Sequence, residues 1–396
     1  MKKIMMLGGN YFQTTAIKCA KELGYYVISV DYLPNNPGHE FSDEYYNVST
    51  LDKEKILELA MRLNIDGILS YASDVSAPTA SYVAEKMYLP TNPYETVKRM
   101  TRKDLFHPFL KENGFFVPSV STIKNIDEFI TFFENHNDVI LKPVNASGSK
   151  GVSRVTDASQ IEPAYLYAKE YSNEADLVAE EFIHREGYQI AGDAFIVDGE
   201  IRFFGLANEH FDASANPLVP VGESFRATLS QNKKDYAREE IQRALTLLGF
   251  KNGAVNLDFM FDTKGNLFII ELGPRNGGNL ISDAIYLQCG VNLAEFSIKA
   301  AVGDSLDGLS EISANKWISS YIFHSLKDGI YNDIMISDKM KEKLIRMDIF
   351  VSPGDVVRNY KNGAFGIGAA LMNFDSEEEM KYMMDNMNEF YNVILK

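Results

Sequence analysis

The 396-residue sequence predicts a protein of mixed α/β and α+β class, long enough for two or three domains. Short apolar strands alternate with amphipathic helices in residues 1–92, as in a parallel, doubly wound sheet. Residues 93–312 instead join apolar runs through short turns such as Asp198-Gly199, a pattern typical of antiparallel hairpins. A smaller α+β segment follows in residues 313–396. We therefore expect domain boundaries near residues 92 and 312.

Composition and charge argue against several classes of protein. The net charge of −16 disfavours a nucleic-acid partner, because binding to a phosphate backbone requires a basic surface. The only cysteines, Cys19 and Cys289, lie far apart without the spacing of a metal site. No run approaches the roughly 18 apolar residues of a membrane span, and the N-terminus lacks the apolar core of a signal peptide. We expect a cytoplasmic protein that contacts neither membrane nor nucleic acid.

The N-terminal segment begins with a strand at Lys3–Leu7, the turn Gly8-Gly9-Asn10 and a helix. Further elements are expected as strands at residues 27–30, 45–48 and 67–70 and as helices at residues 52–63 and 77–86. The turn, with Asp31 after the second strand, mimics a dinucleotide-binding fingerprint but lacks the full G-x-G-x-x-G pattern. If the turn does not bind a dinucleotide, it packs the helix on the strand or lines a substrate crevice at the carboxyl ends of the strands.

A loop of glycine and serine at residues 146–151 is the first candidate for chemistry. It follows a strand that ends in Lys142-Pro143, and a second strand resumes at Val152. Backbone N–H groups of such a loop can point at phosphate oxygens, and the lysine adds positive charge. A plain turn is the competing interpretation. Lys103 lies within a helix expected at residues 98–111 and, taken alone, would be a solvated helix lysine.

Downstream, a strand at residues 177–183 carries the acidic pair Glu180-Glu181. The elements expected after it are a hairpin at residues 189–197 and 200–206, an irregular and potentially functional loop at 210–230, and a helix at 235–248. The last segment is expected to contain strands near residues 318–323 and 365–372 and an acidic helix at 377–387.

A hairpin of residues 255–261 and 267–272 brings two carboxylates together. If a four-residue turn at 263–266 sets the register, Asp258 lies opposite Glu271 on one face. Opposed carboxylates raise each other's pKa unless a cation lies between them, and hard divalent cations prefer oxygen ligands. A register shifted by one residue would leave both acids in solvent. A glycine-rich turn with Arg275 follows directly.

The order of these features resembles the ATP-grasp superfamily over nearly the whole chain. The resemblance rests on the two lysines, the Gly/Ser loop, the acidic pair, the carboxylate hairpin and the arginine after it. It implies a pre-ATP-grasp domain in residues 1–92, an ATP-grasp domain in 93–312 with a flap subdomain at about 117–183, and a lid-like domain in 313–396. Similar organisation is found in biotin carboxylase, the carbamoyl-phosphate synthase large chain and phosphoribosylglycinamide synthetase.

The resemblance also implies where ATP binds. Lys103 and Lys142 would contact its phosphates, under a mobile flap that contains Gly148, Ser149 and Gly151. The strand that ends in Glu180, Glu181, Phe182 and Ile183 would lie against adenine, with an acidic side chain reading the purine edge and Phe182 packed in the core. Gln189 falls at the position of a ribose-binding acidic residue.

For the reaction centre, the resemblance assigns Mg²⁺ or Mn²⁺ to Asp258 and Glu271, and charge stabilisation on the transferred phosphoryl group to Arg275. The chain departs from the family at Gly273, because the usual pattern is Glu-x-Asn-Pro-Arg and its asparagine contributes to the metal site. Asn256, expected to face Gly273, could supply the missing amide oxygen. Further candidates for substrate contact are His210, Arg226 and residues 276–279.

The implied function is an ADP-forming ligase that activates a small carboxylate as an acyl phosphate and couples it to an amine. One alternative within the fold is an enzyme of the purine-pathway type that activates bicarbonate or formate. The other is an ATP-binding protein that has lost catalysis, which the Gly273 departure alone supports. The expected partners are small-molecule carboxylate and amine substrates, and a homodimer is compatible because related ligases often dimerise.

Overall fold

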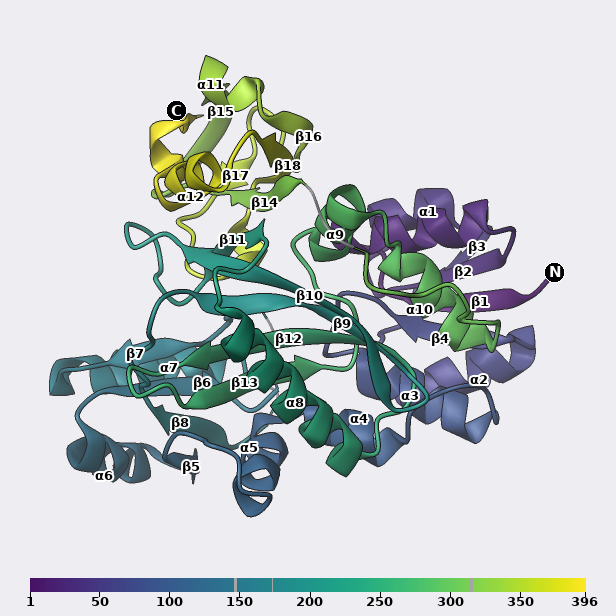
Figure 1. Cartoon of the computed structure of the whole chain (residues 1–396), viewed down its shortest axis with the longest axis horizontal. Helices are drawn as coiled ribbons and strands as arrows, with labels where there is room; N and C mark the ends of the chain where they lie inside the picture. The colour runs from purple at the N-terminus through teal and green to yellow at the C-terminus, as the bar shows by residue number, and fades with distance from the viewer. Residues whose placement is uncertain (146–147, 173, 313–315) are drawn as a thin grey trace.

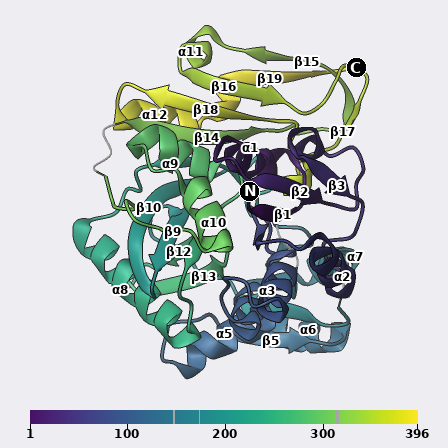
Figure 2. The same ribbon diagram turned by 90° about the vertical axis from the view of Figure 1, so that its right-hand side faces the viewer.

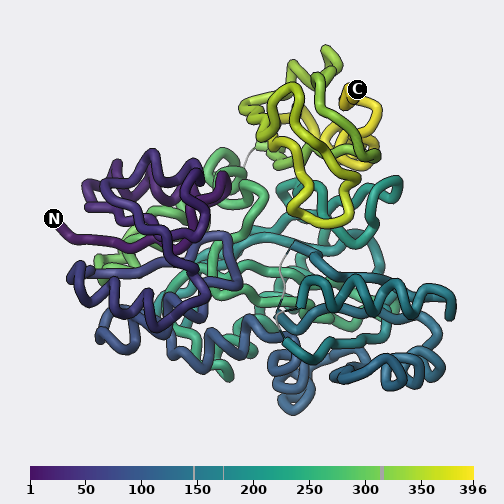
Figure 3. The backbone as a smooth tube through the Cα atoms, turned by 180° about the vertical axis from the view of Figure 1, so that it is seen from behind, coloured from purple at the N-terminus to yellow at the C-terminus, as the bar shows by residue number. Residues whose placement is uncertain are grey.

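The computed structural model describes residues 1–145, 148–172, 174–312 and 316–396. In Figure 1 the purple N-terminal strands lie beside the central teal strands, and the yellow C-terminal segment stands above them. In the turned view of Figure 2 the C-terminal strands lie higher than the N-terminal sheet, and Figure 3 shows from behind that the two are also displaced sideways. The mixed α/β architecture is therefore as expected.

The N-terminal sheet is parallel, with strand order β3-β2-β1-β4. Its elements are β1 (Lys3–Leu7), α1 (Thr14–Glu22), β2 (Tyr26–Val30), β3 (Glu44–Tyr46), α2 (Lys53–Leu63), β4 (Gly67–Ser70) and α3 (Ala77–Lys86). Apolar residues of α2 and α3 cover one face of the sheet. The other face is covered by α1 together with α10 (Leu293–Val302), a helix from much later in the chain.

The turn that mimics a dinucleotide fingerprint has a structural role. The Asp31 carboxylate accepts hydrogen bonds from the backbone N–H groups of Gly9 (3.1 Å) and Leu33 (2.9 Å). Gly8 adopts a φ of 103°, which favours glycine. The carboxylate at the end of β2 is thus committed to the backbone of its own loops.

The structure has two helices where the sequence predicts one. In place of a helix at residues 98–111, α4 (Tyr94–Thr101) ends and α5 (Lys103–Glu112) begins around Arg102, whose backbone is extended. Lys103 is therefore the first residue of α5 rather than a mid-helix lysine. Its backbone N–H donates to the Val144 carbonyl (3.3 Å), so the helix start is tied to the end of β6 (Val139–Pro143).

The flap subdomain is a four-stranded antiparallel sheet of order β5-β8-β6-β7. Besides β6 it contains β5 (Val120–Ile123), β7 (Ser153–Val155) and β8 (Leu177–Glu181), with α6 (Ile126–His136) and α7 (Ile161–Glu170) packed on it. The expected strand at 177–183 ends two residues early, at Glu181, although the Phe182 N–H still donates to the Asp138 carbonyl across from it.

The largest sheet has eight strands in the order β13-β12-β9-β10-β11-β14-β18-β16. Its first five strands are β9 (Gln189–Val197), β10 (Glu200–Phe211), β11 (Pro220–Phe225), β12 (Gly253–Phe261) and β13 (Leu267–Gly273). The segment expected as an irregular loop at 210–230 therefore contains the end of β10 and all of β11. Helix α8 (Gln231–Leu248) covers the face that carries Leu257 and Phe259, and so leaves Asp258 on the opposite face.

A β-bulge sets the register of the β12–β13 hairpin. Near the turn, Phe259 faces Ile269, but beyond the bulge Asp258 faces Glu271 and Asn256 faces Gly273. Ile270 is the extra residue of the bulge. If the register near the turn continued without a bulge, Ile270 and not Glu271 would lie opposite Asp258. The expected pairing of the two carboxylates is confirmed, and it depends on this bulge.

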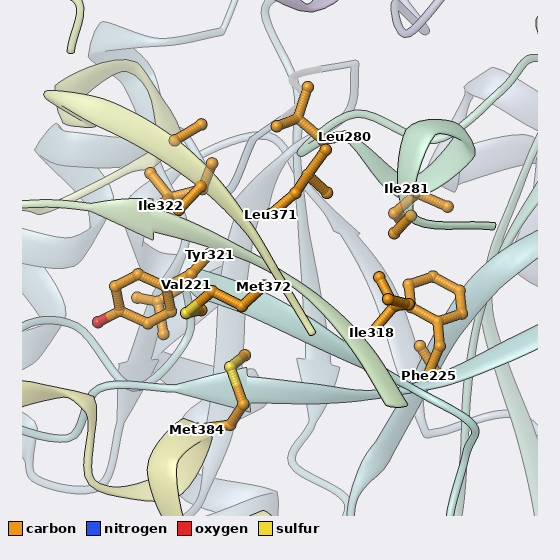
Figure 4. Close-up of a cluster of buried hydrophobic side chains, with 14 of the residues drawn as sticks. Val221, Phe225, Leu280, Ile281, Ile318, Tyr321, Ile322, Leu371, Met372 and Met384 are labelled. Atoms are coloured by element: carbon orange, nitrogen blue, oxygen red, sulfur yellow. The ribbon is translucent and has the colours of Figure 1, made fainter. Parts of the chain in front are cut away.

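The C-terminal segment extends the same sheet. It contains β14 (Trp317–Phe323), β15 (Gly329–Ile336), α11 (Asp338–Lys341), β16 (Leu344–Ile349), β17 (Val356–Val357), β18 (Gly368–Phe374), α12 (Glu377–Asp385) and β19 (Tyr391–Leu395). Strand β14 pairs with β11, so a continuous core runs from the central strands into this segment. Figure 4 shows part of that core, where Phe225 and Ile318 pack near Ile281 of α9 (Ile281–Cys289).

Among the residues that the structure describes, no helix is both long and apolar enough to cross a bilayer.

Candidate active site

Lys142 of β6 and Glu180 of β8 form a buried ion pair. Lys142 Nζ donates to Glu180 Oε2 at 2.6 Å, and His107 Nδ1 of α5 lies 2.8 Å from Glu180 Oε1. Burial would raise the pKa of Glu180, but the charges of Lys142 and His107 lower it well below its ordinary value. His107, which the sequence did not single out, also joins this cluster to the Ile270 carbonyl of the bulge (3.3 Å).

The strand that was expected to lie against adenine, β8, and the residues after it differ from the expectation at two side chains, Glu180 and Phe182. Glu180 points inward to Lys142 and His107, so it is not placed to read a purine edge. Phe182 is not in the core: it is half-buried, and the Arg154 guanidinium lies 3.7 Å from its ring centroid. Glu181 is half-buried and accepts from the Ser119 hydroxyl (3.0 Å). Ile183 lies beyond the end of β8. A contact between this segment and adenine would therefore come from residues 181–183.

The part of the Gly/Ser loop that the structure describes rests on distant segments; Ala146 and Ser147 lie outside the described residues. Gly148, Ser149 and Gly151 all have positive φ. The Gly148 carbonyl accepts from the Gly363 N–H (2.9 Å), and the Ser149 hydroxyl donates to the Leu218 carbonyl (2.9 Å). The loop is thereby folded against the β10–β11 connection and the C-terminal segment.

Asp258 and Glu271 form the acidic centre of the site. Burial, followed by the charge of Glu271, raises the pKa of Asp258 to about 7. The pKa of Glu271 shifts in the opposite direction. Burial would raise it, but the charges of Lys103, Arg275 and Lys142 lower it below its ordinary value. Lys103 Nζ lies 3.5 Å from Glu271 Oε2. The two carboxylates therefore differ: nearby cations outweigh burial at Glu271, whereas at Asp258 the charges of Lys142 and Lys103 do not offset burial and the charge of Glu271.

The acidic row continues across the sheet on the same face. Gln189 Nε2 donates both to Asp258 Oδ1 (2.8 Å) and to Glu209 Oε2 (2.7 Å), and so bridges two carboxylates. Glu209 of β10 lies directly opposite Glu223 of β11. Glu223 accepts from Ser320 (2.6 Å) and Asn279 (3.2 Å), and burial raises its pKa to about 7. Burial also raises the pKa of Glu209 well above its ordinary value, helped by the charges of Asp258 and Glu223.

Sequence reasoning missed Glu209 and Glu223 because the hairpin strand was expected to end at residue 206 and residues 210–230 to be irregular. Apolar residues at every second position, Val219, Val221 and Phe225, would have been the signal for a strand there, with Glu223 on the same face.

Arg275 is held by a carboxylate from the N-terminal sheet. Its guanidinium donates from Nε to Asp74 Oδ1 (2.7 Å) and from Nη2 to Asp74 Oδ2, while Nη2 lies 3.7 Å from Glu271 Oε1. Burial alone would lower the pKa of Arg275, and the carboxylates of Asp74 and Glu271 raise it. Asp74 lies in the loop after β4, at the carboxyl end of a parallel strand, where the sequence had suggested a substrate crevice.

Asp193 of β9 organises the glycine-rich turn that follows Arg275. Its carboxylate accepts from the Gly277 N–H (2.8 Å), the Ser282 hydroxyl (3.0 Å) and the Asn256 amide (3.2 Å). Burial raises its pKa to about 6. The turn leads into α9, and Asn279, just before this helix, donates to Glu223 of the acidic row (3.2 Å). A cavity of about 750 Å³ between β4, α3 and α10 also reaches Arg275 and Asn276.

Two of the substrate-contact candidates lie away from this centre. His210 is buried on the opposite side of β10, where Nδ1 contacts Asp385 (2.9 Å) and Nε2 contacts Ser224 (2.8 Å). Arg226 is exposed and lies over the Trp317 ring. Asn276 is buried and bonded to Ser297 (2.7 Å), so it supports the turn. Asn279, which contacts Glu223, is the candidate that faces the acidic row.

The donor set suits a hard divalent cation bound jointly with phosphates. No group of three or more His, Cys, Asp or Glu side chains that could hold a metal occurs within the described ranges. Mg²⁺ sites in phosphoryl-transfer enzymes typically use only one or two carboxylates plus phosphate oxygens, as Asp258 and Glu271 would provide. The raised pKa of Asp258 is what an uncompensated metal ligand shows. Asn256 commits its amide nitrogen to Gly192 (2.8 Å) and Asp193, so only its oxygen could turn to a metal.

Comparison with known proteins agrees with this geometry. Residues 135–283 match the model of the ATP-grasp domain family, in agreement with the resemblance seen in the sequence. The formate-dependent phosphoribosylglycinamide formyltransferase of Wolinella succinogenes is 30% identical over 184 residues, which cover 46% of this chain and 48% of the relative. The chain thus aligns with about half of that relative's length.

Two solved structures share the fold over the whole chain. An L-amino acid ligase from Bacillus licheniformis superposes with a TM-score of 0.83 at 19% identity, covering 100% of this chain and 99% of that one. The biotin carboxylase domain of the 2-oxoglutarate carboxylase of Hydrogenobacter thermophilus, a dimer solved with MgADP, ADP and bicarbonate, gives a TM-score of 0.76 at 18% identity, covering 100% and 91%. At these identities the likeness shows the fold.

Proposed function

We propose that the chain uses its ATP-grasp domain as an ADP-forming ligase, which activates a small carboxylate as an acyl phosphate and couples it to an amine. The observation that carries the proposal is that Lys103 of α5 (3.5 Å) and Arg275 (3.7 Å) both lie near Glu271, which faces Asp258 on the neighbouring strand, with Lys142 close enough to lower the pKa of Glu271. Such a site gathers positive charge around a metal-ligand pair, which phosphoryl transfer requires.

In this proposal the chain's own residues position and neutralise the reacting groups. Lys103 and Lys142 bind phosphate oxygens of ATP, and Gly148, Ser149 and Gly151 close over them. Residues 181–183 line the adenine, and Gln189 lies beside the ribose. Mg²⁺ or Mn²⁺, held by Asp258 and Glu271, would shield the charge of the phosphates.

The reaction needs no covalent bond to the protein. The substrate carboxylate attacks the γ-phosphorus, the bond to the β,γ-bridging oxygen breaks, and ADP leaves. The amine then attacks the acyl carbon, loses a proton, and phosphate departs. Arg275 lies where it can stabilise the charge of the transferred group and of the acyl phosphate.

A second candidate is the activation of formate or bicarbonate within the same fold. It is favoured by the similarity to the Wolinella formate-dependent enzyme and to the bicarbonate-bound biotin carboxylase domain. The dimer described for the latter also keeps a homodimer as a prediction for this chain.

Phosphate release from ATP and Mg²⁺, measured with pools of amino acids and small carboxylates, tests both candidates. Substrate-dependent ADP with a product one water lighter than its two reactants supports the carboxylate–amine ligase. ADP formation that depends on formate or bicarbonate supports the second candidate. AMP with pyrophosphate contradicts the acyl-phosphate mechanism. Nucleotide binding without turnover on any pool contradicts the ligase for the substrates tested and favours a binding protein.

A further inference from the structure

The pair between Arg275 and Asp74 joins two separate sheets. Asp74 belongs to the loop between β4 and α3 of the N-terminal sheet, and Arg275 follows β13 of the central sheet. Both oxygens of Asp74 accept from the guanidinium, through Nε (2.7 Å) and Nη2. The side chains are 9% and 13% exposed, so solvent screens this pair far less than it screens surface ion pairs. A bidentate contact of this kind fixes the orientation of the guanidinium as well as its place.

A second carboxylate competes for the same arginine. Glu271 Oε1 lies 3.7 Å from Arg275 Nη2, close enough to become the main partner if Asp74 were absent. Glu271 is also one of the two proposed metal ligands. An arginine that turned fully onto Glu271 would place its positive charge against a carboxylate that the metal needs.

Gly273 leaves the space in which the pair forms. A Cβ atom at Gly273 would lie 2.9 Å from Asp74 Oδ1 and 3.1 Å from Arg275 Cζ. Both atoms belong to side chains, and Gly273 is not among the glycines with positive φ. A residue larger than glycine would therefore displace the ion pair and leave the backbone of the hairpin in place.

We propose that Asp74 is the positioning residue of Arg275, and that Gly273 is the position at which the chain accommodates it. Asp74 holds the guanidinium beside the reaction centre and keeps it from turning fully onto Glu271. The N-terminal sheet thereby contributes to the ATP-grasp centre without touching the reacting atoms. This inference rests on the proposed function for its kinetic part only, because its second readout is nucleotide binding.

The first experiment compares wild type with Asp74→Asn, which keeps the size of the side chain and removes its charge. We expect kcat to fall about 10- to 100-fold, as for other residues that orient a catalytic group, with KM for ATP changed less than about threefold. We also expect the Mg²⁺ concentration for half-maximal binding of ADP to rise about tenfold, because Arg275 moves onto Glu271.

Two further variants separate positioning from general stability. Gly273→Ala should reproduce both effects of Asp74→Asn without removing either charge, and the two changes together should cost little more than one alone. The double variant Asp74→Asn/Arg275→Ala should return the Mg²⁺ requirement close to that of Arg275→Ala alone, because no guanidinium remains to occupy Glu271.

Asp304→Asn is the matched control. Asp304 also links the N-terminal sheet to the rest of the chain, through Lys2 Nζ (2.6 Å) and the Tyr25 hydroxyl, but lies away from the acidic row. We expect it to shift the melting temperature without changing kcat or the Mg²⁺ requirement. If Asp74→Asn behaves like Asp304→Asn, the contact only joins the sheets and the inference is overturned. An unchanged Mg²⁺ requirement in Asp74→Asn overturns it even if no pool supports turnover.

Discussion

Two groups of buried carboxylates lie within the same site and have opposite electrostatics. Glu180 is matched by Lys142 and His107, and its pKa is lowered. Asp258, Glu209 and Glu223 are buried on the neighbouring sheet, and the pKa of each is raised. Gln189, Asn279 and Ser320 give these three acids hydrogen bonds but no positive charge.

The difference separates what the fold completes by itself from what it leaves for ligands. An ion pair whose members are both supplied by the chain holds the β6–β8 region and α5 together. Buried acids without cations cost stability unless they take up a proton or a positive ligand. We infer that the acidic row is maintained for binding at the expense of stability, and four predictions test this contrast, from the largest expected effect to the smallest.

The largest effect is expected at the buried ion pair between Lys142 and Glu180. Glu180→Gln leaves the Lys142 ammonium buried without a carboxylate, which should lower the free energy of unfolding by about 3–5 kcal/mol. Urea denaturation at pH 7 measures it. Glu181→Gln, one residue away and half-buried, is the control and should change stability by less than about 0.5 kcal/mol. Equal effects of the two substitutions would contradict the contrast.

Asp258→Asn should have opposite effects on activity and stability. Loss of this proposed metal ligand should reduce kcat by a factor of about 10² to 10³, comparable to the loss of a principal electrostatic contact in other enzymes. The same change removes a buried charge next to Glu271, so metal-free unfolding at pH 8 should require about 1–2 kcal/mol more than in wild type. A variant that is both inactive and less stable would argue that Asp258 is structural.

The third prediction concerns pH and metal. Because the pKa of Asp258 is raised from 3.8 to about 7, the folded protein binds more protons here than the unfolded chain. This group therefore lowers stability as pH rises from about 4 to about 7 in metal-free buffer. Mg²⁺ at about 100 times its dissociation constant should restore about 2.7 kcal/mol at pH 8 and much less at pH 5, when the acids are protonated.

Melting temperatures with Mg²⁺ and with chelator at the two pH values provide the measurement. Asp258→Asn should abolish most of the difference between them. Stabilisation by Mg²⁺ that is the same at pH 5 and pH 8 would mean that the metal binds outside the acidic row.

The smallest effect is expected at Glu223. Glu223→Gln keeps an acceptor oxygen for Asn279, lets its NH2 group donate to the Ser320 hydroxyl, and removes a carboxylate whose pKa burial raises to about 7. Stability at pH 8 should rise by about 1 kcal/mol and depend less on pH between about 5 and 8. Glu223→Ala, which removes the acceptors as well, should instead be destabilising. A loss of stability in both variants would show that the Glu223 charge is compensated.

Most elements of the N-terminal sheet could be predicted because strands and helices alternate there with clear apolar periodicity. The predictions failed where a strand is short or polar. Residues 210–230 looked irregular, yet β11 forms there because β10 and β14 offer ladders on both sides. The single helix expected at 98–111 is broken at Arg102, which places Lys103 at a helix start that sequence periodicity alone could not locate.

The pairing of Asp258 with Glu271 was predicted correctly from an assumed turn, but the turn does not produce it. The turn-proximal register would place Ile270 opposite Asp258, and the bulge at Ile270 corrects it. His107 contacts the Ile270 carbonyl from another part of the chain (3.3 Å). A local pattern could identify both carboxylates, but only packing against α5 and the neighbouring strands decided between the two registers that the sequence left open.

By itself the sequence determined the local features of this protein: the N-terminal alternation, the loop after Lys142, the hairpin with its two acids, and Arg275. These features depend on side-chain period and turn chemistry over a few residues. The tertiary structure decided which cation meets which carboxylate. Lys142 and Glu180 are 38 residues apart and Asp74 and Arg275 are 201 apart. Such pairs form only when the sheets pack, because the interaction of two charges depends on their separation in space. Packing brings these charges within a few ångströms of each other in a buried site, and sequence spacing alone does not reveal this.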